Sequence, residues 1–325
     1  MTKRLLETAH ILIYDPVPAN GNLSRACLLN LGYRNIELVI TLDALENRLK
    51  VCSPDLLLCE VAAAEAEVCR LIQSVRQGSV GDSPFPVVIA ITWRPDSPTV
   101  GQVLRSGADD LLARPISADT LETRIMAHLE RRKLFVITSD YIGPDRRLDP
   151  SRSGPECIAV PNPLQIKARK DISIEKSERY MAKAIGRGKK MLNLEKMRRD
   201  AVQLCKHWRN LEGCGIDAPD FFEILPAMVR LSEEIRRRAD GTDYGATCEW
   251  CDSIVKSAHA ISLMTNRTEG YLSHSEADFE SALRVVGVAA LAIGQMFVEG
   301  NVPLPPPPKP VVKDEKTLTE IFASA

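Results

Sequence analysis

Four side chains that could take part in chemistry each follow a short apolar run in the first third of the sequence. Asp15 comes after ILIY, Glu60 ends LLLCE, Thr92 ends VVIAIT and Arg114 follows DLLA. Such runs suit strands that are buried on both faces, and these strands belong to parallel sheets. The carboxyl ends of parallel strands lie at one edge of the sheet, where α/β folds hold their ligands. We therefore expect two carboxylates, a hydroxyl and a guanidinium to meet at that edge.

The elements that must position these groups alternate between strand and helix patterns from Ala9 to about Arg132. The expected strands are His10–Tyr14, Ile36–Thr41, Asp55–Cys59, Phe85–Ile91 and Asp110–Ala113. The expected helices are Asn22–Leu31, Leu42–Val51, Ala64–Arg76, Thr99–Ser106 and Ala118–Arg132, with Ser117 or Asp119 as a cap of the last and Gly32 and Gly107 closing two others. Five strand–helix units predict an α/β fold with a doubly wound, five-stranded parallel sheet covered by helices on both faces.

Three further motifs accompany the four side chains: PDLLL before Glu60, LRSGADDLLARPI around Arg114, and LLNLGY after the first expected helix. Together they resemble the receiver domain of two-component response regulators, a flavodoxin-like fold, over about residues 8–133. The resemblance implies phosphoryl transfer from a histidine kinase to an aspartate at the end of the third strand. It also implies a magnesium ion held by that aspartate and by two acidic residues after the first strand, with a hydroxyl and a lysine that bind the phosphoryl group.

The sequence departs from that pattern at three positions. Glu60 stands at the phosphoacceptor position, Pro16 at the second acidic position and Arg114 at the lysine position, whereas Asp15 and Thr92 match. Mg²⁺ requires near-octahedral oxygen coordination, so the loss of one carboxylate to Pro16 weakens a site that keeps only Asp15 of the acidic pair. Glutamate is one methylene longer than aspartate, which displaces the nucleophilic oxygen from the position that in-line transfer requires. We therefore expect no cofactor and a magnesium site that is largely lost, with Asp15 as its remaining candidate ligand.

Three interpretations of Glu60 stay open. It could be a working phosphoacceptor. It could reach toward Thr92 and Arg114 and mimic a phosphorylated aspartate, and the planar fork of Arg114 suits a bidentate contact with a carboxylate better than lysine does. It could instead be inert in a pseudo-receiver that only packs and dimerises.

Composition places the chain among ordinary soluble proteins. It has 325 residues, 45% hydrophobic and 26% charged, and a formal net charge of −1, which excludes a globally basic nucleic-acid binder. Nine cysteines without a secretory signal favour free thiols in a reducing cytoplasm. No apolar run approaches the roughly 18 to 20 residues that a membrane helix needs. We expect a cytoplasmic bacterial protein that does not enter a membrane.

The second half is predicted to be helical. Residues 135–176 carry DYIGPDRR and other Pro- and Gly-containing stretches, which indicate an extended connector. The expected helices beyond it, whose apolar residues recur every three or four positions, are Glu178–Leu211, Asp220–Ala239, Ala246–Asn266 and Glu276–Glu299. Such helices joined by short loops predict an all-α antiparallel bundle.

His259 is the candidate phosphotransfer residue of this bundle. At 100° per residue it falls on the outer face of its helix with Asp252 and Lys256. The stretch SAH resembles the start of the motif of histidine-phosphotransfer domains. However, Ser262 and Leu263 replace the lysine and glycine which that resemblance implies, and a solvated histidine remains the alternative.

Two other features have structural alternatives. CEWC (Cys248–Cys251) has the spacing of a metal or redox pair, but without a second pair it indicates core packing, with Cys251 on the buried stripe. Residues 167–209 contain fourteen Lys or Arg and five Asp or Glu, which suits phosphates, an acidic partner or a solvated helix. No compact helix-turn-helix accompanies them, so nucleic acid is not the expected partner.

The sequence thus predicts a receiver-like domain (1–134), a connector (135–176), a helical bundle (177–300), and a Pro-rich linker and tail peptide (301–325) containing LPPPPKP. We expect a non-enzymatic adaptor of two-component signalling that binds proteins, with a homodimer through the receiver and a docking partner for the tail. The alternatives are a phosphorelay component acting through His259 and a DNA-binding regulator acting through the basic helix 177–210. The sequence does not indicate which kinase or pathway is involved.

Overall fold

The structure is a computed structural model that describes residues 7–147, 157–168, 173–213, 219–265 and 276–298. The chain divides into two compact units, Met1–Leu192 and Asn193–Ala325, which we call the N-terminal and the C-terminal unit. Helix α8 (Ile174–Glu212) contributes residues to both units. The predicted tail at 301–325 lies outside the described residues.

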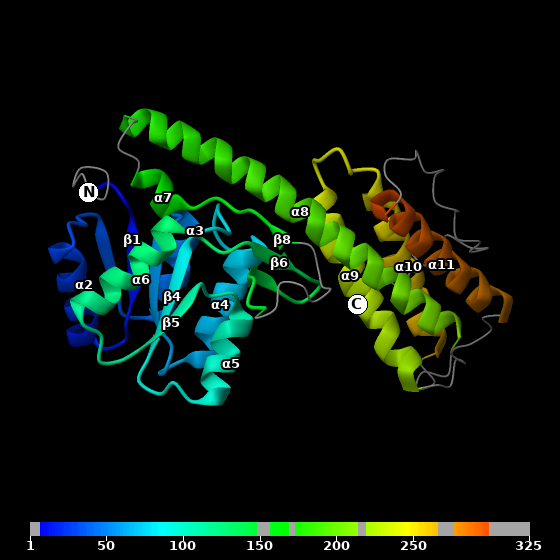
Figure 1. Ribbon diagram of the computed structural model, residues 1–325. Coiled ribbons are helices and arrows are strands. Elements are labelled where there is room, and N and C mark those ends of the chain that lie inside the picture. Colours follow the sequence, from blue (N-terminus) through cyan, green and yellow to red (C-terminus); the bar gives the residue numbers. More distant parts are fainter. Residues whose placement is uncertain (1–6, 148–156, 169–172, 214–218, 266–275, 299–325) are drawn as a thin grey trace. The chain divides into compact units, whose positions relative to one another are not determined.

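The N-terminal unit is built on a five-stranded parallel sheet with the strand order β2-β1-β3-β4-β5 (Figure 1). Its strands are β1 (Ile11–Tyr14), β2 (Ile36–Val39), β3 (Leu56–Glu60), β4 (Val87–Thr92) and β5 (Asp110–Ala113). Every residue of β1, β3 and β4 is buried, as expected for strands that are covered on both faces. The predicted doubly wound parallel sheet is confirmed.

Five helices connect and cover these strands (Figure 1). They are α2 (Pro18–Asn30), α3 (Leu42–Val51), α4 (Glu65–Gln77), α5 (Ser97–Ser106) and α6 (Ala118–Glu130). Helix α2 begins four residues before its predicted start, because Pro18 at the first helical position has the φ of a helix and no N–H to satisfy. The predicted cap of the last helix is confirmed, since the Ser117 hydroxyl accepts the Thr120 N–H at 3.0 Å.

Alternating strand residues form two apolar cores on opposite faces of the sheet. Leu12, Leu57 and Val88 pack with residues of α3, α4 and α5, whereas their neighbours in sequence pack with residues of α2 and α6. Because side chains alternate along a strand, each strand supplies both cores. The sheet is therefore held from both sides, and the ends of its strands have fixed positions.

The predicted extended connector is wrong for the described part of residues 135–168. Strands β6 (Phe135–Ile137), β7 (Ile142–Pro144) and β8 (Cys157–Ile158) form an antiparallel sheet in the order β7-β6-β8, followed by the short helix α7 (Pro163–Lys167). Strands of two or three residues are too short to show a periodicity in the sequence. The compact unit accordingly continues to Leu192, well beyond the predicted domain end at residue 134.

A buried ionic cluster joins this small sheet to the main one. Asp109 accepts hydrogen bonds from Arg76 at 2.7 Å and from Arg132 at 3.3 Å, and all three side chains are at most 3% exposed. The guanidinium carbons of Arg76 and Arg132 lie 5.2 and 5.0 Å from the centre of the Phe135 ring. Burial lowers the pKa of Arg76 to about 10, although Asp109 opposes that shift. This cluster holds β6 close to α4 and to the start of β5.

The first half of α8 packs on the same unit through Gly188 and Leu192. A Cβ atom at Gly188 would lie 2.7 Å from Pro161 and 2.9 Å from Phe85, so only glycine permits this close approach. Leu192 lies in an apolar cluster with Phe85 and Phe135. Helix α8 starts four residues before its predicted start.

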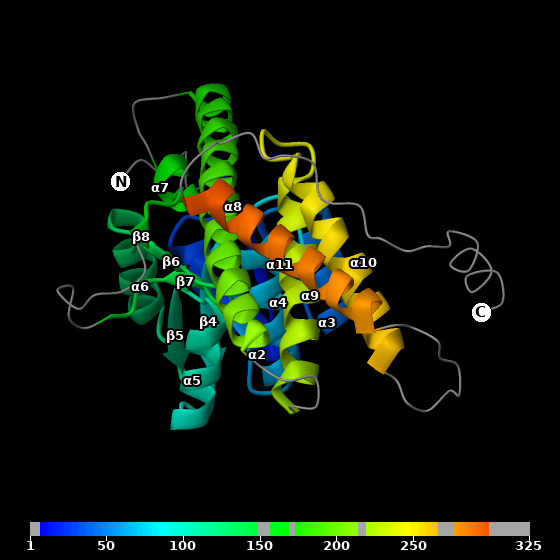
Figure 2. The same cartoon turned by 90° about the vertical axis from the view of Figure 1, so that its right-hand side faces the viewer.

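The C-terminal unit contains the second half of α8 together with α9 (Pro219–Ala239), α10 (Thr247–Thr265) and α11 (Glu276–Val298). Helix α10 lies beside both α9 and α11, as Figure 2 shows. The four segments share one apolar core. The apolar side chains of α9, α10 and α11 that are buried in this core, at the predicted spacing of three or four residues, include Phe221, Leu225, Met228, Ile235, Trp250, Ile254, Ala258, Ile261, Phe279, Val286, Ala290, Ile293 and Phe297.

Within the described residues, the stretch Ala277–Phe297 of α11 is long and apolar enough to cross a membrane, which the sequence reasoning did not anticipate. However, 61% of that stretch's apolar window is buried against the rest of the unit. The core helix of a soluble protein can have the same length and composition, so this stretch does not by itself indicate a membrane span.

Candidate functional site

The structure brings the four predicted side chains to the carboxyl edge of the main sheet. Asp15 directly follows β1, Glu60 ends β3, Thr92 ends β4 and Arg114 directly follows β5. The parallel register aligns these ends, with Tyr14 beside Cys59 and Thr92 beside Ala113. Asp15, Glu60 and Thr92 are each at most 3% exposed.

Arg114 bridges the two carboxylates. Its Nη2 donates to Asp15 Oδ2 at 2.6 Å, and its Nε donates to Glu60 Oε2 at 3.1 Å. Its side chain is only 6% exposed, so both ion pairs are largely removed from water. The expected bidentate contact with Glu60 alone is therefore not what the structure contains, because the guanidinium fork is shared between two partners.

Backbone N–H groups occupy the two remaining carboxylate oxygens. Val17 N–H donates to Asp15 Oδ1 at 2.9 Å, and Ala62 N–H donates to Glu60 Oε1 at 3.0 Å. Each bond spans two residues and holds the loop that leaves its strand. All four carboxylate oxygens thus have hydrogen-bond donors from the chain itself.

Thr92 is hydrogen-bonded within its own loop. Its Oγ1 accepts the Arg94 N–H at 3.1 Å and donates to the Arg94 carbonyl oxygen at 3.5 Å. The mimic interpretation expected Glu60 to reach Thr92 as well as Arg114. In the structure, the side-chain partners of Glu60 are Arg114 and the Ala62 backbone.

Trp93 covers Arg114, a feature that the sequence reasoning missed. The guanidinium carbon lies 5.7 Å from the centre of the Trp93 ring, a cation–π distance, while 53% of Trp93 remains exposed. The signal in the sequence was its place directly after Thr92, where the main chain leaves the sheet edge.

The electrostatics of the site follow from its burial. Burial raises the pKa of Glu60, whereas the Ala62 N–H and Arg114 act in the opposite direction and the charge of Asp15 raises it further. Burial also raises the pKa of Tyr14, and electrostatic interactions with Cys59, Asp15 and Glu60 add to that shift. One guanidinium therefore faces two carboxylates in a region that is nearly inaccessible to water, and backbone N–H groups bond the two remaining carboxylate oxygens.

The carboxylate oxygens that a magnesium ion would need are bonded to Arg114 and to backbone N–H groups. Mg²⁺ needs free oxygen ligands at about 2.0–2.1 Å in octahedral geometry. The oxygens of Asp15 and Glu60 already accept hydrogen bonds, and position 16 is a proline. Among the described residues, no group of three or more His, Cys, Asp or Glu side chains could hold a metal ion.

The other two candidate residues of the sequence analysis, His259 and Cys251, both lie on α10. His259 is exposed on α10, as are Lys256, Ser262 and Leu263, the last with 58% of its surface accessible. Its phosphorylation stays a prediction. Cys251 is fully buried in the core, where burial raises the pKa of its thiol to about 12, so an inert packing role suits it.

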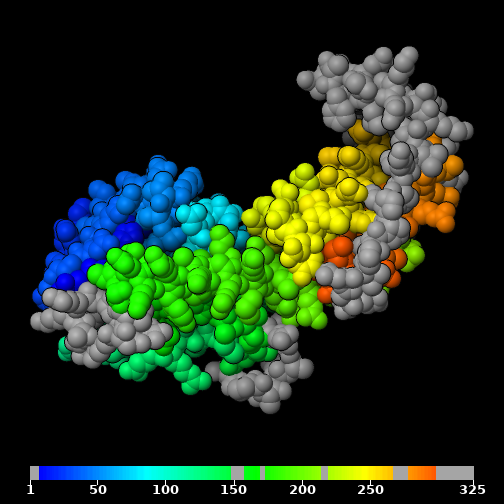
Figure 3. Space-filling view, turned by 90° about the horizontal axis from the view of Figure 1, so that it is seen from above, coloured from blue at the N-terminus to red at the C-terminus, as the bar shows by residue number. Residues whose placement is uncertain are grey.

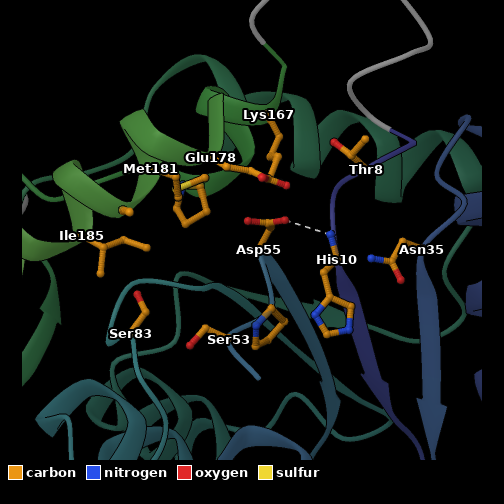
Figure 4. A pocket seen from close by; sticks show the side chains of 13 residues that line it. Thr8, His10, Asn35, Ser53, Asp55, Ser83, Lys167, Glu178, Met181 and Ile185 are labelled. Carbon is orange, nitrogen blue, oxygen red and sulfur yellow. Dashed lines mark hydrogen bonds between the residues drawn. The ribbon is translucent and has the colours of Figure 1, made fainter. Parts of the chain in front are cut away.

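A pocket of about 480 Å³ lies at the amino edge of the sheet, where none of the four predicted residues is found (Figure 4). Asp55, before β3, accepts the His10 N–H at 2.8 Å within this pocket. Burial raises the pKa of Asp55, although the His10 N–H and the charge of Lys167 oppose that shift. Met181 and Ile185 of α8 form an apolar wall. The pocket is therefore separate from the carboxylate cluster.

Comparisons with known proteins concern the N-terminal part of the chain. No known protein family matches the sequence, and no curated protein does. Three similar solved structures are receiver domains. One is a response regulator signal receiver domain from Bermanella marisrubri, with 21% identity over 36% of this chain and 95% of that one and a TM-score of 0.33. A CheY-like receiver domain from Methanospirillum hungatei has 20% identity over 38% of this chain and 94% of that one, with a TM-score of 0.34.

A third similar structure is the receiver domain of a sensor histidine kinase from Pseudomonas aeruginosa, which has a magnesium ion in its active-site cleft. It shares 21% identity over 36% of this chain and 93% of that one, with a TM-score of 0.32. The five-stranded parallel sheet of the N-terminal unit is consistent with a receiver fold.

Proposed function

We propose that this chain is an atypical response regulator that acts as a non-catalytic adaptor in two-component signalling, through protein–protein contacts. The observation that supports this function best is the bridge of Arg114 between Asp15 and Glu60. The bridge supplies, from within the chain, the positive charge that a receiver would otherwise take from a metal ion.

Three contacts argue against phosphoryl transfer at Glu60. Each of its carboxylate oxygens already accepts a hydrogen bond, which fixes the carboxylate in the bridge and makes its oxygens less nucleophilic. The Thr92 hydroxyl bonds to Arg94 instead of facing an incoming group. Trp93 lies over Arg114 at the mouth of the site. In-line transfer depends on positioning and charge stabilisation, and the Arg114 cation is already engaged by the two carboxylates.

The test is phosphoryl uptake and metal binding by the full chain. Incubation with acetyl phosphate and Mg²⁺, followed by intact-mass measurement, is expected to show no added phosphoryl group, and calorimetric titration is expected to show no Mg²⁺ binding. The matched control is the triple variant P16D/E60D/R114K, which restores the acidic pair, the aspartate and the lysine, and which should bind Mg²⁺. Stoichiometric uptake by the unmodified chain would refute the proposal.

The adaptor role is tested by affinity purification from cells. Comparing the full chain with one that lacks Leu304–Ala325 asks whether the tail carries the partner, and E60Q and E60D ask whether the partner recognises the state of the bridge. If Glu60 acts as a mimic, E60Q should weaken partner binding. Unchanged binding of both variants would leave the inert interpretation.

A further inference from the structure

The first half of α8 carries positive charge on the face that points away from the N-terminal unit. Its buried face contains Ser177, Met181, Gly188 and Leu192. At 3.6 residues per turn, a second set of side chains lies about 160° around the helix from that face. We call this set the basic stripe: Lys176, Arg179, Lys183, Arg187 and Lys190, all exposed. In Figure 3 this half of α8 lies open on the surface of the unit.

The cations of the basic stripe lack the partners that other cations of the protein have. Among the described residues, no carboxylate lies within 4.0 Å of any of the five, whereas half-buried Arg48 and exposed Lys50 and Arg70 of the same unit each have one. The second half of the same helix also differs, since Arg199 pairs with Glu195 at 2.6 Å. Five uncompensated cations on one face repel one another, and that cost falls when an anionic surface covers them.

The spacing of the stripe matches another helix better than a nucleic acid. Its members are three or four residues apart and extend over about 21 Å, at about 1.5 Å per residue. A partner helix has the same rise, so glutamates at the same spacing meet each cation in turn. On duplex DNA the phosphates follow grooves about 6 and 12 Å wide, so a straight row of this length passes over gaps between them.

Exposed apolar groups beside the stripe also favour a protein partner. Tyr180 and Met191 are 51% and 48% exposed on the same side of α8. Such side chains gain free energy by contact with apolar groups of another protein, which a sugar–phosphate backbone offers only sparsely. We infer that the basic stripe is the docking surface for an acidic amphipathic helix of a partner protein. The inference rests on the proposed adaptor function only in that the partner is a protein.

The test uses the full chain and two synthetic peptides as probes. One is a helical peptide of about five turns with glutamates on one face and leucine beside them, and the other has the same composition with the glutamates spread around the helix. The first is expected to bind at least about tenfold more tightly, and to weaken as salt rises from about 50 to 200 mM. The variant K183E/R187E/K190E should lose at least about tenfold in affinity, since each exposed ion pair contributes modestly.

Two further variants separate a specific loss of binding at the basic stripe from a general effect of altered charge or folding. The variant K50E/R70E changes exposed cations elsewhere on the unit and should alter affinity less than about twofold. The neutral variant K183Q/R187Q/K190Q, checked for helical content, covers the case in which charge reversal disturbs α8. Equal binding of the two peptides, or full binding by both stripe variants, would overturn the inference. Duplex DNA that binds as tightly as the first peptide would also overturn it, in favour of a nucleic acid. These binding measurements do not involve magnesium or phosphoryl uptake at Glu60, so they can fail independently of the proposed function.

Discussion

Replacing Arg114 by methionine removes the cation of the bridge while keeping a side chain of similar length. Asp15 and Glu60 then remain as buried carboxylates, with side-chain exposures of 1% and 4%, and with only their backbone donors. Breaking a buried ion pair from one side costs about 3–5 kcal/mol, because the remaining charge is left uncompensated. We expect R114M to lower the free energy of unfolding of the N-terminal unit by that amount at neutral pH.

The cost should depend on pH in a definite direction. Burial already raises the pKa of Glu60, and Arg114 opposes that shift, so the pKa rises further in the variant. A carboxyl whose pKa is higher in the folded state than its unfolded value of about 4.3 costs no stability while it is protonated in both states. The cost appears as the pH rises from the unfolded pKa of Glu60 to its higher folded pKa. R114M should therefore be least destabilising near pH 4 and most destabilising near pH 8.

Hydrogen exchange of the buried amides in β3 and β4 measures this free energy in the full chain, separately from the C-terminal unit. The matched control is R124M, which removes a 51% exposed guanidinium 3.3 Å from Asp110 and should cost less than about 1 kcal/mol. The double variant R114M/E60Q has one fewer buried charge and should recover part of the loss. A cost below about 1 kcal/mol for R114M, unchanged between pH 4 and 8, would contradict the electrostatic account of the bridge.

Three further predictions concern other parts of the chain. G188A should destabilise the packing of α8 on the unit, because a Cβ atom there would lie less than 3.0 Å from neighbouring side chains. A Cβ atom in G186A meets no atom within 4 Å, so this variant should stabilise the helix by about 0.5–1 kcal/mol. Thermal unfolding of the two variants tests this difference. D109N should cost about 3–5 kcal/mol by leaving Arg76 uncompensated, and chemical denaturation with a cost under about 1 kcal/mol would contradict this. Burial raises the pKa of Asp200 to about 6, so its ionisation should oppose folding as pH rises from about 4 to 6; a carboxyl NMR titration with a midpoint below about 4.5 would be inconsistent with this.

The sequence predicted the main sheet well for a physical reason. Strands buried on both faces are continuous apolar runs, and Asp110–Ala113 and Leu42–Val51 have their predicted bounds. The small sheet at residues 135–158 was missed because its strands are held by long-range contacts, such as those of Phe135 with two arginines, and not by local periodicity. A pattern read along the chain contains no information about such contacts.

The sequence could predict which side chains lie near one another in the site, but not their contacts. Topology alone brings the ends of β1, β3, β4 and β5 together, so the sequence located Asp15, Glu60, Thr92 and Arg114 correctly at one edge. The sharing of the Arg114 fork depends on side-chain torsions and on loops that place the N–H groups of Val17 and Ala62. Those distances are set within tenths of an ångström by packing, and residue types do not determine them.

The three departures from the receiver pattern have one electrostatic consequence when they are taken together. A lysine presents one compact, strongly hydrated ammonium, whereas the edge of the Arg114 guanidinium presents Nε and Nη2 as separate donors, one for Glu60 and one for Asp15. The longer side chain of Glu60 brings its carboxylate to Nε while its other oxygen reaches the Ala62 N–H. Pro16 adds no third carboxylate, which the single cation would have to balance as well. The single guanidinium of the bridge thus interacts with both carboxylates, and a change at any one of the three positions alters the charges or the donors of the site.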